Sequence, residues 1–224
     1  MPGKILVIIS CSGRKKNDEG SSGCRWVKEN SAVGRLSRDK AAALLACRRS
    51  LPGNYPKKFH HKEEKDLGGN REGTVPLMPA IERYTGKLYG EIDSSLWKRL
   101  KGSEDSMEVV IVSALYGLLT PWEAIRNYDL AMDEAYGKRF QLWRWWRNQG
   151  LGGMLCEFVD RSGASTVHDF LGGPYRNISR GLKAQASSKF RLIPHQYPGE
   201  GSGSIYHRGR DIRKLMEKTL GDGS

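Results

Sequence analysis

Three short segments carry the side chains best suited to chemistry. Residues 10–16 (SCSGRKK) combine small hydroxyls, a thiol, flexible backbone amides and three cations, a composition that suits phosphate. Residues 113–121 (SALYGLLTP) and 172–176 (GGPYR) add further hydroxyls, glycines and an arginine. Each segment follows a run of apolar residues that reads as a strand. The carboxyl ends of parallel strands meet at one edge of a sheet, so we expect the three segments to form a common polar floor.

Acid–base and nucleophilic groups lie in or near the same segments. Asp129 and the preceding Tyr128 are a candidate catalytic pair, with Asp129 as the acid–base carboxylate; if Asp129 is enclosed among Arg and Lys it would be ionised and could act as a base or orient a hydroxyl. A cap on the following turn is the alternative role of Asp129. Ser113 and Cys11 are the candidate nucleophiles because both lie at strand ends, although neither a G-x-S-x-G elbow nor a neighbouring histidine accompanies them.

The remaining candidates hold a ligand or nucleic acid. Those expected to contact a small ligand are hydroxyl, aromatic, glycine or cationic residues: Ser12, Lys15, Lys16, Tyr84, Lys87, Tyr116, Gly117, Gly172, Gly173, Tyr175 and Arg176. Those expected to line a nucleic-acid groove are Arg14, Arg180, Arg208 and Arg210. Each segment also has a plainer interpretation. Residues 13–16 could be a solvated loop, residues 172–173 a tight turn, and residues 116–117 a turn before a helix beginning at Pro121.

Known cofactor motifs are not matched. Residues 13–15 lack the Walker spacing, and no G-x-G-x-x-G fingerprint occurs. The five histidines include an adjacent pair, but none forms an H-x-x-x-H or H-E-x-x-H spacing. The sequence therefore predicts no metal site and no cofactor.

The elements that must position these residues alternate between strand and helix. Residues 4–10 and 108–113 are apolar and rich in β-branched side chains without alternation, as in central strands of a parallel sheet. Together with two weaker candidates, the expected strands are 4–10, 108–113, 164–172 and 190–194. The expected helices are 39–49, 93–100, 138–146 and 211–220. This alternation predicts an α/β fold with a mainly parallel central sheet flanked by helices.

Some stretches do not fit this alternation. Residues 17–23 are polar and glycine-rich, residues 50–80 read as a long loop or insertion, and residues 199–204 as a mobile turn. Three tryptophans in 143–147 alternate with arginines and could stack bases. On a helix, however, Trp143 and Trp146 share a face and would belong to the core.

Composition restricts the class of protein. The 224 residues include 38% hydrophobic side chains, enough for one folded domain spanning 1–224. No apolar run approaches the roughly 20 residues that cross a bilayer. The four cysteines form no C-x-x-C pair, which fits reduced thiols in the cytoplasm. We therefore expect a cytoplasmic protein without a membrane partner, and the sequence leaves its oligomeric state open.

The positive charge is concentrated at the two ends of the chain. The net charge of +12 divides into +8 for residues 1–80, −2 for 81–175 and +6 for 176–224. An excess of this size indicates an anionic partner, although basic proteins without one are also common. If the fold brings the two ends together, one positive surface or cleft results; otherwise there are two weaker patches.

Four blocks of the sequence resemble consecutive blocks of the YaaA peroxide-stress protein family. They are residues 84–89 (YTGKLY), 111–121 (IVSALYGLLTP), 125–130 (IRNYDL) and 137–143 (GKRFQLW). The resemblance extends over about 84–216 and includes the first strand. It implies one YaaA-like α/β domain with a variable basic helical and loop insertion at about 25–83. The chain departs from the family at Ala131, where the family carries a glutamate, and residues 27–83 show no recognisable helix-hairpin-helix.

The resemblance also implies a function. Proteins of this family are thought to bind DNA and to limit oxidative DNA damage by restraining free iron. The resemblance thus implies that this protein binds nucleic acid, DNA above all, in a basic cleft and protects it from damage by peroxide and iron. Related domains occur near enzymes that exchange modified bases, including archaeosine synthases. The alternative is thus an enzyme acting on a nucleotide, nucleoside or small anionic metabolite, by glycosidase- or transferase-like chemistry, in the same cleft.

Overall fold

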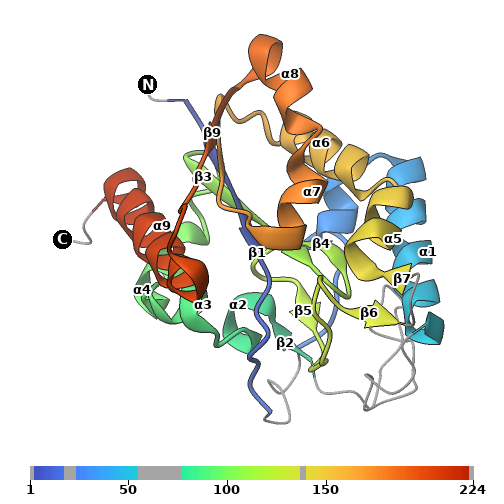
Figure 1. Cartoon of the computed structure of the whole chain (residues 1–224). Coiled ribbons are helices and arrows are strands. Elements are labelled where there is room, and N and C mark those ends of the chain that lie inside the picture. Colours follow the sequence, from blue (N-terminus) through green and yellow to red (C-terminus); the bar gives the residue numbers. More distant parts are fainter. Residues whose placement is uncertain (1–2, 18–23, 55–76, 137–139, 222–224) are drawn as a thin grey trace.

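A five-stranded sheet forms the centre of the molecule (Figure 1). The computed structural model describes residues 3–17, 24–54, 77–136 and 140–221. The strands lie in the order β4-β3-β1-β8-β9. Their bounds are β1 Ile5–Ser10, β3 Met107–Ser113, β4 Gly117–Leu119, β8 Thr166–Asp169 and β9 Arg191–Pro194. All neighbours pair in parallel except β3 and β4, which are antiparallel. The predicted α/β fold with a mainly parallel sheet is confirmed.

The two central strands are the most apolar segments of the chain. Residues 6–9 of β1 are fully buried, and every residue of β3 is buried. β1 pairs with β3 over its whole length, with Val7 opposite Val109, and with β8 on its other side. Because helices cover both faces, an uninterrupted aliphatic run is favoured over alternation at these positions.

Helices cover the sheet in two groups, which Figure 1 places on opposite sides. One group consists of α1 (Arg38–Asn54), α5 (Leu142–Asn148), α6 (Leu151–Ser162), α7 (Arg176–Ser179) and α8 (Leu182–Lys189), with α6 touching the other four. The other consists of α3 (Lys87–Gly90) and α4 (Ser94–Leu100), both packed on α9 (Ser204–Leu220). The short helix α2 (Ala80–Arg83) follows β2 (Met78–Pro79), which pairs with β5 (Ala124–Ile125). A hairpin of β6 (Ala135–Tyr136) and β7 (Phe140–Gln141) precedes α5.

A buried ion pair holds the chain between β3 and β4. Arg48 of α1 donates to Glu123 at 2.8 Å, to the carbonyl oxygen of Tyr116 at 2.9 Å and to that of Leu118 at 2.7 Å. Both charged side chains are fully buried. Glu123 also accepts hydrogen bonds from the indole of Trp26 and from the backbone N–H of Ala32, each at 2.9 Å. The pair thus connects α1 with three other segments and fixes the turn that contains Tyr116.

Several predicted elements have different bounds in the structure. Pro121 begins no helix, because residues 121–122 form a turn before β5. The helix expected over 138–146 begins at Leu142, after β7. The C-terminal helix begins at Ser204, seven residues before its expected start, and takes in the end of the segment expected to be a mobile turn. Trp146 is fully buried and Trp143 partly so, as expected for core positions.

Parts of other predictions lie outside the described residues. Of the long loop or insertion expected at 50–80, residues 55–76 are not described; the described ends belong to α1, β2 and the start of α2. Residues 18–23 of the polar segment 17–23 also lie outside. Within the described ranges, no helix is both long enough and apolar enough to cross a bilayer.

Candidate functional site

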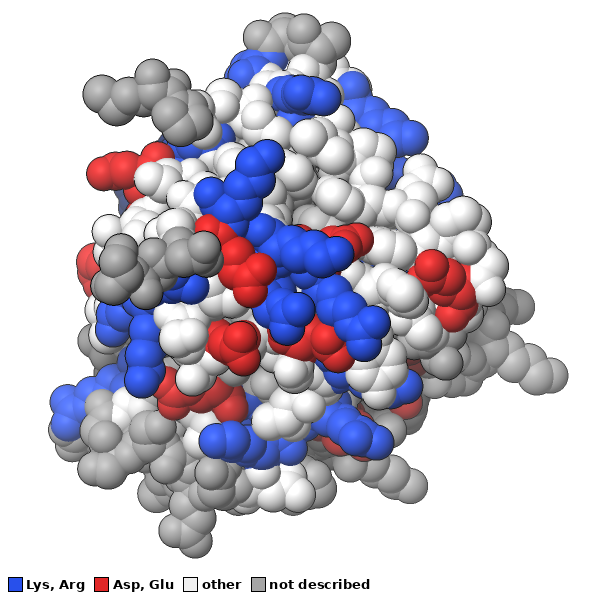
Figure 2. Space-filling model, turned by 90° about the vertical axis from the view of Figure 1, so that its left-hand side faces the viewer, with Lys and Arg blue, Asp and Glu red and all other residues white. Residues whose placement is uncertain are grey.

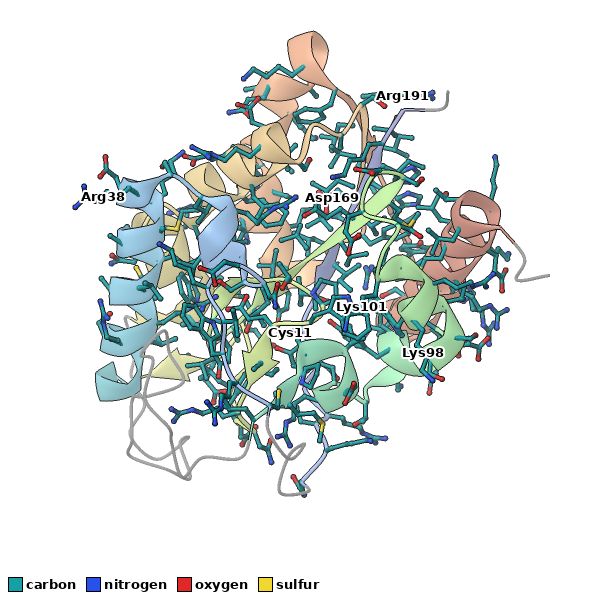
Figure 3. The ribbon with its side chains drawn as sticks, turned by 180° about the vertical axis from the view of Figure 1, so that it is seen from behind. Cys11, Arg38, Lys98, Lys101, Asp169 and Arg191 are labelled. Atoms are coloured by element: carbon teal, nitrogen blue, oxygen red, sulfur yellow. The ribbon has the colours of Figure 1, made fainter. Side chains whose placement is uncertain are left out.

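The three predicted segments meet at the carboxyl edge of the parallel strands. Cys11 follows β1, and its Sγ lies 3.1 Å from the Oη of Tyr175, which follows β8. The strand that precedes the third segment joins them, because the N–H of Cys11 donates to the carbonyl oxygen of Val112 in β3 at 2.9 Å. Tyr116, which follows β3 and was predicted to contact a ligand, is fully buried and packs edge-on against Tyr128 with ring centroids 5.8 Å apart. In Figure 3, Cys11 and Asp169 lie at the centre of the molecule, where β1 and β8 end. Parallel pairing of the strands therefore produces the convergence that the sequence predicts.

Ser113 and Tyr128 belong to a buried hydroxyl network. The Oη of Tyr128 lies 3.0 Å from the Oγ of Ser113 and 2.7 Å from the Oη of Tyr84. Ser113 Oγ also accepts the backbone N–H of Tyr116 at 3.1 Å. Burial raises the pKa of both Tyr84 and Tyr128 well above the usual value, so these phenols stay protonated and act as neutral donors. This network lies beneath the site and connects the segment after β3 to the loop at residue 84.

Lys15 covers this network with a buried ammonium group. Its Nζ lies 4.0 Å from the ring centroid of Tyr128 and 5.9 Å from that of Tyr84. Nζ is inaccessible to solvent and has no hydrogen-bond partner among the described residues. Burial lowers the pKa of Lys15, while the charges of Cys11 and Asp129 act in the opposite direction. Lys15 also forms a backbone β-bridge with Tyr84, which holds the loop after β1 against the rest of the site.

Two adjoining pockets open beside this cluster and share Gly13 and Arg14. The Asp129 pocket, of about 440 Å³, is also lined by Lys15, Thr85, Asn127 and Asp129. The Cys11 pocket, of about 350 Å³, is also lined by Cys11, Lys87, Asp133, Tyr175, Ile205 and Arg208. Both volumes lie within or near the range of small-molecule sites.

Glycines allow close approach at two places on the floor of the site. A Cβ at Gly86 would lie 2.1 Å from the Oγ of Ser12. A Cβ at Gly172 would lie 2.4 Å from the Nη2 of Arg208. The conformation of Gly172 is ordinary extended backbone, so the close approach of the guanidinium is what favours glycine here.

Arg208 enters the site from α9. Its guanidinium stacks on the ring of Tyr197, 5.2 Å from the centroid, and its Nε is buried without a hydrogen-bond partner in the described part of the chain. Burial lowers the pKa of Arg208, and the neighbouring charge of Arg176 adds to the decrease. Arg176 itself is oriented by hydrogen bonds to the carbonyl oxygen of Leu171 at 3.3 and 3.4 Å. The two guanidinium groups thus lie close enough to influence each other, and the Nε–H of Arg208 has no acceptor among the described residues.

The predicted cations separate into two regions. Arg14, Lys15, Lys87 and Arg208 line the two pockets, where Asp129 and Asp133 are the lining carboxylates. Lys16 is exposed on the same loop. Arg180 lies instead in a separate groove of about 640 Å³ over α6–α8, with Lys40 and Arg147, and Arg210 donates to Glu91 at 3.0 Å.

The remaining predicted residues support the turns of the site. Gly117 has a φ of 72°, and a Cβ there would meet Leu44 and Trp146 within 2.9 Å. Gly173 has a φ of 53° and begins the 3-10 turn that carries Tyr175. Asp129 is exposed at the rim of its pocket. No group of three or more His, Cys, Asp or Glu side chains in the described ranges is arranged to hold a metal ion.

Sequence reasoning missed a histidine pair near this edge. His168 Nδ1 lies 2.9 Å from His195 Nε2, and the His195 ring stacks on Phe170 with centroids 3.8 Å apart. Burial lowers the pKa of His168 to about 4, and the neighbouring His195 and Arg191 add to the decrease. The two histidines are 27 residues apart in sequence, so only the pairing of β8 with β9 brings them together.

Figure 2 views the molecule from the side of α9. Lys and Arg side chains gather across the middle of this face, with Asp and Glu side chains among them. Charges of both signs thus share this face.

Comparison with models of protein families identifies the family of this chain. The model of a protein family described as peroxide stress protein YaaA matches residues 5–190. The matched range includes β1, β3, β8 and the turns at Gly117 and Gly173. A search of curated proteins finds no match to this chain.

Proposed function

The chain belongs to the peroxide stress protein YaaA family, and we propose that it acts under peroxide stress by binding nucleic acid, with the Asp129 and Cys11 pockets as its contact with phosphate. Its place of action is the cytoplasm. By covering DNA, the bound protein protects it from peroxide and free iron. The membership in the family supports the stress response, and the chemistry of the two pockets supports the ligand.

One observation carries the choice of ligand: the two pockets hold unused positive charge. Their lining has four cations against two carboxylates. The Nζ of Lys15 and the Nε of Arg208 are both buried, and neither has a hydrogen-bond partner among the residues that the structure describes. An unpaired buried donor costs free energy, about 1–3 kcal/mol for a neutral group and more for a charged one. A phosphate oxygen would supply the missing acceptor to Arg208 and a countercharge to Lys15.

The position of the site supports the same ligand. The Cys11 pocket lies between the loop after β1 and the start of α9, so it takes cations from both ends of the chain, Arg14 from the first and Arg208 from the second. Such a field attracts polyanions and accelerates their association. Lys16 and Arg176 extend the positive charge beyond the pocket walls.

The experiment is a binding titration with a fluorescent DNA oligonucleotide at low salt. The test variant replaces Arg14, Lys87 and Arg208 by alanine. The control removes equal charge elsewhere through Arg38→Ala, Lys183→Ala and Arg191→Ala, of which Arg38 and Arg191 lie far from Cys11 in Figure 3. We expect the test variant to lose at least tenfold in affinity and the control to lose much less. No binding by the unaltered protein at about 50 mM salt, where phosphate contacts are strongest, would remove the proposal.

A second candidate is an enzyme acting on a nucleotide, nucleoside or small anionic metabolite in the same pockets. The specific observation in its favour is the grouping of a thiol, a buried amine and a carboxylate around one site: Cys11, Lys15 and Asp129. In this reading Asp129 is the acid–base group, the cations hold phosphate or carboxylate, and Tyr175 orients the ligand.

Thermal shift and one variant separate the two candidates. A small ligand at 100 times its dissociation constant stabilises the folded state by about 2.7 kcal/mol, so a screen of nucleotides and nucleosides would detect it. Asp129→Asn should abolish turnover but keep or slightly strengthen polyanion binding, because it removes a negative charge from the rim. If no small molecule shifts the melting temperature, the enzyme candidate loses its support.

A further inference from the structure

Two adjacent hydrophobic side chains, Ile205 and Tyr206, are exposed beside the Cys11 pocket. In the described part of the chain, three large hydrophobic side chains are exposed: Val27, Ile205 and Tyr206. Ile205 and Tyr206 are adjacent in the first turn of α9, with 39% and 38% of their surface exposed. Single exposed apolar residues are ordinary, but this pair adjoins a site that is rich in cations.

Helix geometry directs the two side chains differently. Residues three apart share a helix face, and accordingly Ile205 and Arg208 both line the Cys11 pocket. Tyr206 is rotated about 100° from Ile205 and lies at the rim instead. The Nζ of Lys87, another lining residue, lies 4.7 Å from the centroid of the Tyr206 ring. The exposed ring of Tyr206 thus lies beside the ammonium group of Lys87, which lines the pocket together with the partly buried guanidinium of Arg208.

An exposed aromatic ring beside two pocket cations matches the alternating bases and phosphates of a single-stranded nucleic acid. Single-stranded nucleic acid is bound by aromatic side chains that stack on bases and by cations that follow the backbone. In a duplex the base faces are stacked on one another, so a rim tyrosine cannot reach them. A pocket of about 350 Å³ also admits a phosphate with its sugar more readily than a double helix.

We infer that the nucleic acid is bound as a single strand, with one base stacked on the ring of Tyr206 and the adjoining phosphate held in the Cys11 pocket between Lys87 and Arg208. This inference rests on the proposed function and specifies its ligand. Lys87 leaves the tyrosine ring for the phosphate when the base takes its place. Ile205 contributes an apolar edge against the sugar or the base.

The test compares a single strand of about 12 nucleotides, within the range of known single-strand sites, with the duplex of the same sequence. Fluorescence anisotropy should give tighter binding of the single strand. Tyr206→Ala should weaken that binding by about 5- to 150-fold, the loss expected for one stacked base. Tyr206→Phe should retain it, because the ring is kept. Val27→Ala, at the third exposed hydrophobic residue, is the matched control and should have no effect.

A spectroscopic readout separates stacking from a general loss of affinity. With 2-aminopurine in the strand, saturating protein should quench the fluorescence by stacking, and Tyr206→Ala should restore it at saturation. Thermal melts of each variant check that the fold is intact. If strand and duplex bind equally and Tyr206→Ala changes neither affinity nor quenching, the inference is wrong while phosphate binding stands. If neither nucleic acid binds, the proposed function itself fails.

Discussion

The buried ion pair of Arg48 and Glu123 gives the sharpest prediction about stability. Arg48→Met keeps an unbranched apolar stem but removes the guanidinium, with its charge and three donated hydrogen bonds. Glu123 would remain fully buried without its countercharge, and the carbonyl oxygens of Tyr116 and Leu118 would lose their donor. Removing one partner of a buried pair costs about 3–5 kcal/mol, a large part of the 5–15 kcal/mol that stabilises a typical fold.

Urea unfolding followed by tryptophan fluorescence measures this cost. With a slope of about 3 kcal/mol per M, the midpoint should fall by about 1 M or more. Arg49→Met is the matched control, because Arg49 is the exposed neighbour on the same helix, and such surface changes stay within about 0.5 kcal/mol. In the double variant Arg48→Met/Glu123→Gln, the cost should be smaller than the sum of the two single costs, because no unpaired charge remains. A loss below about 1 kcal/mol for Arg48→Met, or strictly additive costs, would refute this reasoning.

Three further predictions follow from single positions. Gly117→Ala should destabilise the fold by about 2–4 kcal/mol, since a left-handed φ and contact with Trp146 both oppose a Cβ; a calorimetric melt measures this, and a change below 1 kcal/mol would contradict it. Gly172→Ala should displace the guanidinium of Arg208 and weaken nucleic-acid binding several-fold while the melting temperature changes little; unchanged affinity would speak against a role for Arg208. The pKa of His168, about 4 in the folded chain against 6.5 ordinarily, means that the unfolded state binds more protons between these values. The contribution of His168 to stability is therefore complete above pH 6.5 and is lost as the pH falls toward 4. His168→Gln should reduce this slope in urea titrations at several pH values, and an identical slope would exclude the effect.

Sequence patterns were sufficient for the strands and for the edge where the site forms. The aliphatic runs at 4–10 and 108–113 have few alternatives to buried strands, and β1 and β3 occupy them to within one residue at their starts. Once the strands are parallel, the segments after them must meet, and Cys11 and Tyr175 do so. These predictions succeeded because they rest on local residue types and on one topological rule.

The contacts that depend on helix placement could not be read from the sequence. Arg48 looks like one more cation at the end of a basic helix, and only the packing of α1 shows it fully buried against Glu123. Arg180 lines a separate groove over α6–α8, and its spacing of four residues from Arg176 did not reveal this. The burial of the Lys15 ammonium over Tyr128 likewise needs the position of the loop after β1.

The salt dependence of DNA binding tests the central claim most directly. Each phosphate contact to a single strand contributes about −0.7 to the slope of log affinity against log salt concentration. Contacts from Arg14, Lys87 and Arg208 therefore predict a slope of about −2. Arg208→Ala should make it less steep by about 0.7, whereas Arg38→Ala should leave it unchanged. A slope that Arg208→Ala does not alter would contradict the claim that these pockets bind the phosphates of nucleic acid.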